Sequence, residues 1–139
     1  MALSNTDEIL DDLAFFDDWE ERYKYIIDLG KELEPMQQSL KTDEKLVKGC
    51  QSNVWLDVVQ AEQQQLHFIV DSDAIIVRGL LALVMAAFNQ KSAEDIVGFD
   101  INAYFNALDL ERHLSPTRGN GLRAIVAKIQ HIAQAQLKN

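Results

Sequence analysis

The chain has 139 residues, a formal net charge of −9 at pH 7 and one cysteine. This length fits a single domain of residues 1–139, and a chain of this size buries about two thirds of the surface that it exposes when unfolded, so it can form a core without a disulfide or a structural metal. One cysteine excludes an intramolecular disulfide and a cysteine-rich zinc or iron–sulfur site, and the acidic balance argues against nonspecific nucleic-acid binding and against binding to anionic membranes.

Two helices are predicted in the N-terminal part of the chain. Residues 6–16 form a first short helix. Asp17 and Asp18 then offer N-caps to a second one, and the glutamates three residues after each aspartate resemble a capping box. The apolar face of this second helix has spacings of four, seven and eight from its first residue and consists of Trp19, Tyr23, Ile26 and Ile27. The helix should end between residues 30 and 33, before Pro35.

Strands are predicted in the middle of the chain. Residues 34–44 are polar and indicate a loop, and residues 45–48 indicate a short edge strand. In the runs 54–60 and 66–70, apolar residues recur at every second position. The polar AEQQQ separates the two runs. An antiparallel hairpin is the natural pairing of these two runs.

Helices return in the second half. Asp71 or Ser72 is expected to cap a helix over residues 73–89, which is apolar nearly all round and therefore central. Ser92 begins a short helix, and residues 101–108 form another. After HLSPTRGNG, the last helix has an apolar stripe made of Leu122, Ile125, Val126, Ile129, Ile132, Ala133 and Leu137. The expected fold is α+β, with a small three-stranded antiparallel sheet packed with helices.

Neither a targeting signal nor a membrane span is apparent. The N-terminal sequence MALSNTDEILDDLAFFDDWEER is acidic and has no basic flank before an apolar run. The longest apolar run, residues 74–88, is interrupted by Arg78 and Gly79 and is too short to cross a bilayer. A lone cysteine fits a reducing compartment. We therefore expect a soluble, cytoplasmic protein.

Cys50 is the first candidate for chemistry. A free cysteine is often just a small buried core residue, whereas a single thiol on a loop suits a carrier of one sulfur atom. Gly49 permits a backbone with positive φ and leaves room for an incoming group. A thiolate is the nucleophilic form of cysteine, and nearby lysines and hydrogen-bond donors favour it. Such neighbours are Lys45, Lys48, Gln51, Ser52 and Asn53.

Four stretches together resemble the SufE family of sulfur-acceptor proteins (SufE and CsdE-like). They are WEERYKYIIDLGKEL, LVKGCQSNVWLDV, LHFIVDSDAIIVRGLLALV and HLSPTRGNGLRAIV, and the resemblance extends over residues 16–129. Two departures are that AEQQQ lacks a turn glycine and that RGNG stands where a serine often precedes the asparagine. Neither departure touches the cysteine motif.

The resemblance implies a fold shared with NifU and IscU-like scaffold proteins. It also implies that Cys50 takes sulfane sulfur from the persulfide of a pyridoxal-phosphate (PLP) cysteine desulfurase of the SufS or CsdA type. The protein would then stimulate that enzyme and pass the sulfur to an iron–sulfur assembly scaffold or another recipient. No cofactor or metal is expected on this chain, which would be a sulfurtransferase-type accessory protein with little activity alone. The alternative is a non-covalent adaptor in which Cys50 is structural.

Residues expected to contact the desulfurase surround the cysteine. They are Gly49, Gln51, Ser52, Asp73, Arg78 and Arg118. The simpler interpretation is that Asp71 and Ser72 cap a helix and that Arg78 is an ordinary surface residue; capping is favoured for Asp71.

Two further features have weaker claims to chemistry. No two of the histidines, His67, His113 and His131, are four residues apart, so a zinc site is not expected, and His67 should face the less buried side of its strand. The SPTRGNG segment is either an anion site or a turn followed by a cap at Asn120, and we favour the turn.

Overall fold

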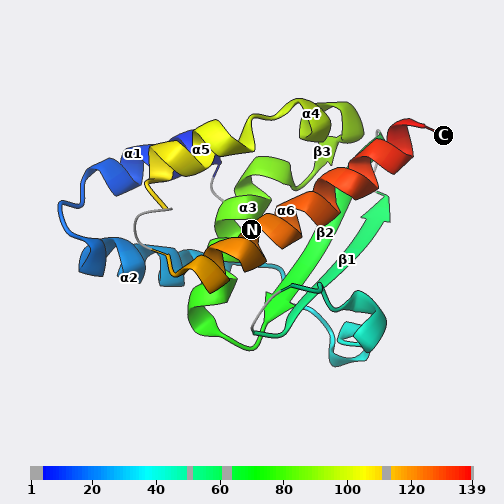
Figure 1. Cartoon of the computed structure of the whole chain (residues 1–139), viewed down its shortest axis with the longest axis horizontal. Coiled ribbons are helices and arrows are strands. Elements are labelled where there is room, and N and C mark those ends of the chain that lie inside the picture. The colour runs from blue at the N-terminus through cyan, green and yellow to red at the C-terminus, as the bar shows by residue number, and fades with distance from the viewer. Residues whose placement is uncertain (1–4, 50–51, 61–63, 111–113, 139) are drawn as a thin grey trace.

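The computed structural model describes residues 5–49, 52–60, 64–110 and 114–138 (Figure 1). Within these residues the chain forms six α-helices and one sheet of three antiparallel strands. The helices are α1 (Thr6–Ala14), α2 (Trp19–Leu29), α3 (Ile75–Phe88), α4 (Ala93–Gly98), α5 (Ile101–Leu108) and α6 (Pro116–Leu137). Short 3₁₀ turns span Gly30–Glu32, Gln38–Leu40 and Asp43–Lys45. The predicted α+β class is confirmed.

The sheet is built on the predicted hairpin. Strand β1 (Val54–Gln60) pairs antiparallel with β2 (Gln65–Ser72), in a register that places Val54 opposite Ser72 and Trp55 opposite Asp71. The third strand is β3 (Lys91–Ser92), which pairs with the start of β2. The predicted edge strand at residues 45–48 is wrong. Residues 43–45 form a 3₁₀ turn and Gly49 turns the chain, so only an isolated bridge between Leu46 and Trp55 remains.

The two faces of the hairpin differ in burial, because successive side chains of a strand point to opposite faces. The inward side chains of β1 and β2 are buried: Val54, Leu56, Leu66, Phe68 and Val70. The outward side chains opposite them are half-buried, except for the exposed Val59. Helix α3 packs against β2, α2 and α6, and nine of its fourteen residues are buried, which confirms its predicted central place. Figure 1 shows α6 running the length of the sheet, with the short turns of residues 38–45 beside β1.

Side-chain caps fix where several helices begin. The side chain of Asp18 accepts a hydrogen bond from the Glu21 backbone N–H at 2.8 Å, and Ser92 caps α4 in the same way. For α3 the expected cap at Asp71 is wrong. The N-cap position is Ala74, whose N–H donates to the Ser72 hydroxyl at 3.2 Å, and Asp71 lies within the last part of β2.

The start of α6 also corrects a prediction. The SPTRGNG segment is helical rather than a turn capped at Asn120, because Ser115 is the N-cap and Pro116 is the first helical residue. The Ser115 hydroxyl accepts a hydrogen bond from the Arg118 N–H at 3.2 Å. A serine cap followed by proline is a strong helix start, and it prevails here over the two glycines that follow.

Candidate functional site

The segment that carries the single cysteine is held at both ends by the hairpin. Cys50 and Gln51 lie outside the described residues. On either side of them, the Val47 N–H donates to the Val54 carbonyl at 2.9 Å, and Leu46 bridges Trp55. Both Val47 and Val54 are buried. The six residues 48–53 therefore connect two antiparallel stretches whose ends are part of the core.

Gly49 shows the backbone freedom that its position suggested. Its φ is +96°, a region that other residues seldom adopt, as predicted. A Cβ added at this glycine would lie 3.3 Å from the Cβ of Ala124 in α6. Gly49 therefore turns the chain where it passes close to α6.

The other side of the segment lies against the start of α3. The Asn53 carbonyl accepts a hydrogen bond from the Asp73 N–H at 3.3 Å, and the side chains of Asn53 and Asp73 are both exposed. Ser52 is half-buried. Of the residues expected to surround Cys50, the structure thus places Asp73 beside Asn53, the residue that follows Ser52, and Gly49 beside α6.

Arg78 belongs to a cluster of charged residues at the same end of the sheet, which we call the Asp71 clamp and define as Lys41, Trp55, Asp71 and Arg78. The Asp71 carboxylate, with 14% of its side chain exposed, lies 2.9 Å from the Lys41 Nζ and 3.2 Å from the Arg78 Nε. It also accepts a hydrogen bond from the Ser72 N–H at 2.8 Å. The Lys41 ammonium lies 5.4 Å from the centroid of the Trp55 ring, within cation–π range.

The contact between Arg78 and Asp71 is electrostatic rather than a well-aligned hydrogen bond. The Arg78 Nε atom is buried, and its N–H is not aligned with an acceptor as a hydrogen bond requires. Its distance of 3.2 Å to the Asp71 carboxylate is that of an ion pair. Opposite charges attract whatever the direction of the N–H bond, so the ion pair does not depend on an aligned hydrogen bond. Arg78, with 42% of its side chain exposed, is therefore tied to β2 by an ion pair.

Lys45 is engaged by a carboxylate instead of lying free to favour a thiolate. Its ammonium donates to Asp57 on β1 at 2.7 Å. This hydrogen bond and the negative charge of Asp57 raise the pKa of the Lys45 ammonium above its ordinary value. Lys48, also expected to favour the thiolate, is exposed.

Arg118 lies in the first turn of α6 with an exposed side chain. It precedes Ala124, the neighbour of Gly49, by six residues, which is about 9 Å along a helix axis. Arg118 is thus on the helix that borders the cysteine segment, roughly two turns from the point of closest approach.

The histidines do not gather into a site. His67 faces the half-buried side of β2, as predicted, and its Nε2 lies 3.1 Å from Glu34. His131 is exposed on α6, and His113 lies outside the described residues. In the ranges that the structure covers, no three His, Cys, Asp or Glu side chains are grouped so as to hold a metal ion.

No helix of those ranges is both long and apolar enough to cross a membrane.

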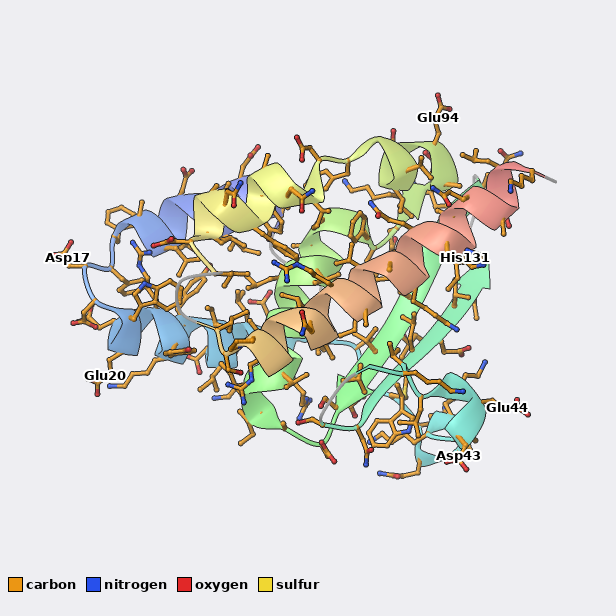
Figure 2. All side chains as sticks on the ribbon, viewed as in Figure 1. Asp17, Glu20, Asp43, Glu44, Glu94 and His131 are labelled. Carbon is orange, nitrogen blue, oxygen red and sulfur yellow. The ribbon has the colours of Figure 1, made fainter. Side chains whose placement is uncertain are left out.

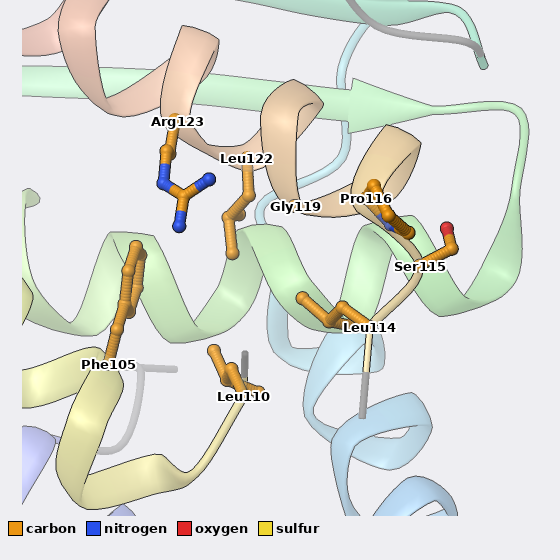
Figure 3. A pocket seen from close by; sticks show the side chains of 8 residues that line it. All are labelled: Phe105, Leu110, Leu114, Ser115, Pro116, Gly119, Leu122 and Arg123. Carbon is orange, nitrogen blue, oxygen red and sulfur yellow. The ribbon is translucent and has the colours of Figure 1, made fainter. Parts of the chain in front are cut away.

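A cavity of about 250 Å³ lies at the start of α6 (Figure 3). Leu110, Leu114 and Leu122 form much of its wall, and the Arg123 side chain extends across it toward Phe105. We assign no ligand to this cavity.

The surface is acidic, with one notable apolar side chain close to the site. Figure 2 shows Asp17, Glu20, Asp43, Glu44 and Glu94 pointing outward from widely separated elements. Among the described residues, the exposed large hydrophobic side chains are Phe15, Val59, Ile75, Val97 and Leu137. Ile75, with 66% of its surface exposed, is the first residue of α3 and follows by two residues Asp73, whose N–H donates to the Asn53 carbonyl.

Sequence reasoning missed the clamp. In the sequence Lys41 belongs only to a polar loop, and the signal that points to its partners is weak. The hairpin register predicts Trp55 opposite Asp71, but nothing local in the sequence brings Lys41 to that pair.

Comparison with known proteins identifies the class to which this fold belongs. A solution structure of a hypothetical protein from Thermus thermophilus matches with a TM-score of 0.77 over 100% of both chains, at 16% sequence identity, and so shares the α+β fold. The family model described as SufE, Fe-S metabolism associated domain, matches residues 7–133. The chain belongs to the SufE family.

Relatives of similar length support this assignment. An uncharacterized SufE-like protein of Rhizobium meliloti (strain 1021) is 44% identical over 138 residues, covering 97% of this chain and 99% of the relative. A second uncharacterized SufE-like protein, from Rhizobium etli, is 41% identical over 139 residues, covering 98% and 94%. The family description associates the domain with iron–sulfur metabolism.

Proposed function

We propose that this protein is a persulfide carrier that accepts sulfane sulfur on Cys50 from a PLP-dependent cysteine desulfurase and passes it on for iron–sulfur cluster assembly. The observation that supports this most is the membership of the SufE family together with a single thiol on a short connection anchored in the core. Residues 1–139 act as one domain in this proposal, and the thiol has to remain reduced, which suits the cytoplasm.

The transfer step needs no cofactor on this chain. The Cys50 thiolate attacks the outer sulfur of the partner's persulfide, R–S–SH, where R–S is the partner's cysteine. A new bond forms between the Cys50 sulfur and that outer sulfur, while the bond between the two sulfurs of the partner breaks. The products are Cys50–S–SH and the partner's thiolate, so atoms and charge balance and no oxidant is consumed. Clearing the enzyme's cysteine readies it for another turnover, which is how the carrier stimulates the desulfurase.

The surroundings of Cys50 suit brief contact with a large partner. Gly49, which precedes Cys50 in the chain, adds no side chain, and the exposed Asn53 and Asp73 are hydrogen-bonded to each other at the far end of the connection. We propose that Gly49, Gln51, Ser52, Asp73, Arg78 and Arg118 contact the desulfurase. An iron–sulfur scaffold or another sulfur recipient would then discharge the persulfide by the same exchange chemistry.

The test compares stimulation of a cysteine desulfurase by the wild-type protein and by the Cys50→Ser variant. Alanine release is measured with cysteine as substrate and without added reductant. We expect the wild type to raise turnover several-fold and Cys50→Ser to have no effect. Stimulation that persists in the serine variant would instead support a non-covalent adaptor.

A further inference from the structure

The Asp71 carboxylate is connected, through its two ion-pair partners Lys41 and Arg78, to both ends of the segment that carries Cys50. The Lys41 ammonium is 2.9 Å from Asp71 and 5.4 Å from the Trp55 ring centroid. Trp55 in turn bridges Leu46, and the next residue, Val47, is hydrogen-bonded to Val54. The chain that leads into the segment therefore lies against β1, and Lys41 holds its first residue there, ahead of the Lys45–Asp57 ion pair and the backbone contacts of residues 46 and 47.

The chain that leaves the segment is held from the same carboxylate through α3. Arg78 lies 3.2 Å from Asp71, and its own N–H donates to the Ala74 carbonyl in the first turn of α3. Just before that turn, Asp73 holds the Asn53 carbonyl through its N–H. Asp71 thus connects to Val47 by way of Lys41 and Trp55, and to Asn53 by way of Arg78 and α3.

Charge makes this arrangement sensitive to a single substitution. The carboxylate is 14% exposed and the Lys41 side chain 18% exposed, so water screens their attraction only partly. If the negative charge of Asp71 were lost, the Lys41 ammonium and the Arg78 guanidinium would face each other without a counter-charge. Of the contacts described above for this side chain, the hydrogen bond from the Ser72 N–H would be the one that remains. Both connections would then weaken together.

We propose that Asp71 is a positioning residue for sulfur transfer. Through Lys41 and Arg78, it holds both ends of the Cys50 segment in the arrangement that the desulfurase engages. The proposal rests on the proposed function. It assigns a role to Asp71 and Lys41, which the transfer chemistry itself does not use.

The experiment compares two ways of loading Cys50 with sulfur, each followed by intact mass. One donor is the persulfidated desulfurase, which must dock against the segment. The other is glutathione persulfide, which needs only access to the thiol. The variants are Asp71→Asn, Lys41→Met and the double variant, where the methionine keeps much of the apolar stem over Trp55 while removing the charge. Glu34→Gln is the matched control, because the ion pair of Glu34 with His67 lies on the same face at the other end of the hairpin.

The expected result separates the two donors. Each single variant should lower the rate of loading from the desulfurase about tenfold, since small errors of position slow a transfer strongly. The double variant should lose no more than Asp71→Asn alone, because that substitution already removes the ion pair with Lys41. Loading from glutathione persulfide should stay within about twofold of the wild type, because this exchange depends on the thiolate and its accessibility and needs no docked partner. Glu34→Gln should behave as the wild type with both donors.

Thermal unfolding of every variant shows that the assays use folded protein, and Lys41→Met keeps the test valid if Asp71→Asn fails to fold. Unchanged loading of Lys41→Met from the desulfurase would overturn the proposal. A parallel loss with both donors would also overturn it, since Asp71 would then act on the thiol itself. If the wild type loaded from glutathione persulfide but never from a desulfurase, the proposed function would fail, and the role of Asp71 with it.

Discussion

Gly79 of α3 lies directly against Ile26 of α2. A Cβ added at Gly79 would be 2.8 Å from both the carbonyl carbon and the Cγ2 of Ile26, closer than real Cβ atoms approach. Gly30, just after α2, approaches Gly79 in return, with a virtual Cβ 2.9 Å from the Gly79 nitrogen. Two glycines thus let α2 and the buried α3 come together backbone to backbone.

This contact predicts opposite effects for two glycine-to-alanine substitutions in helices. Gly79→Ala should destabilise the protein by about 3 kcal/mol, because the neighbour that must move is backbone. Gly119→Ala in α6 should stabilise it by about 0.5–1 kcal/mol, because an added Cβ there meets nothing within 4 Å and alanine favours helix. Urea unfolding of both variants measures the two changes, and a Gly79→Ala variant as stable as the wild type would refute the close approach.

Substitution of Gly49 should strain the cysteine segment. Alanine at φ +96° is disfavoured and its Cβ would meet Ala124, so we expect Gly49→Ala to cost about 1–2 kcal/mol and to slow sulfur loading of Cys50. Gly98→Ala is the matched control, since nothing lies within 4 Å of the added atom and no positive φ is present. Unfolding free energies and loading rates that are equal in the two variants would contradict this role of Gly49.

Tyr104 should make the protein sensitive to alkali. Its hydroxyl is buried and donates to the Leu83 carbonyl at 3.0 Å, and burial raises its pKa well above the ordinary value of 10.0. Above pH 10 the unfolded chain ionises this tyrosine while the folded protein keeps it protonated. The contribution of Tyr104 to the free energy of unfolding is therefore fully present below pH 10. Above pH 10 this contribution falls by about 1.4 kcal/mol per pH unit.

Removing the hydroxyl tests that assignment. Tyr104→Phe should be less stable at pH 7 by about 1–2 kcal/mol, because the Leu83 carbonyl loses its buried donor. Between pH 10 and 11 its stability should fall less steeply than that of the wild type. Parallel unfolding curves for the two proteins across this interval would show that Tyr104 does not cause the alkaline loss.

Ile75 should contribute to docking of the desulfurase. An apolar side chain that is 66% exposed at the start of α3, two residues after Asp73, can fill an apolar pocket on a partner. Ile75→Asp should weaken binding of the desulfurase about tenfold or more in calorimetric titration. Val97→Asp, which changes an exposed apolar residue of α4, should bind as the wild type does. Equal affinities for the two variants would exclude Ile75 from the interface.

Local sequence signals predicted the elements well where a single stretch determines them. The alternation of residues 54–60 and 66–70 gave the correct hairpin, and Asp18 and Ser92 cap helices as expected. The apolar run that became α3 was correctly placed in the centre because it has no polar face to expose. The resemblance to the SufE family, carried by the motif around Cys50, is also confirmed over residues 7–133.

Features that depend on distant partners could not be predicted in this way. The third strand pairs Lys91 with Leu66, so it is determined by where α3 returns the chain rather than by its own two residues. Asp71 was expected to be a cap because an aspartate before a helix usually is one. Its actual partner Lys41 is thirty residues away and reaches it only once the chain has folded.

The most direct test of the central claim is the intact mass of this protein after incubation with a cysteine desulfurase and cysteine, before and after reduction. We predict one added sulfur atom that dithiothreitol removes, and that is absent from Cys50→Ser treated in the same way. A wild-type mass that stays unchanged, while the desulfurase itself is shown to carry a persulfide, would contradict the account.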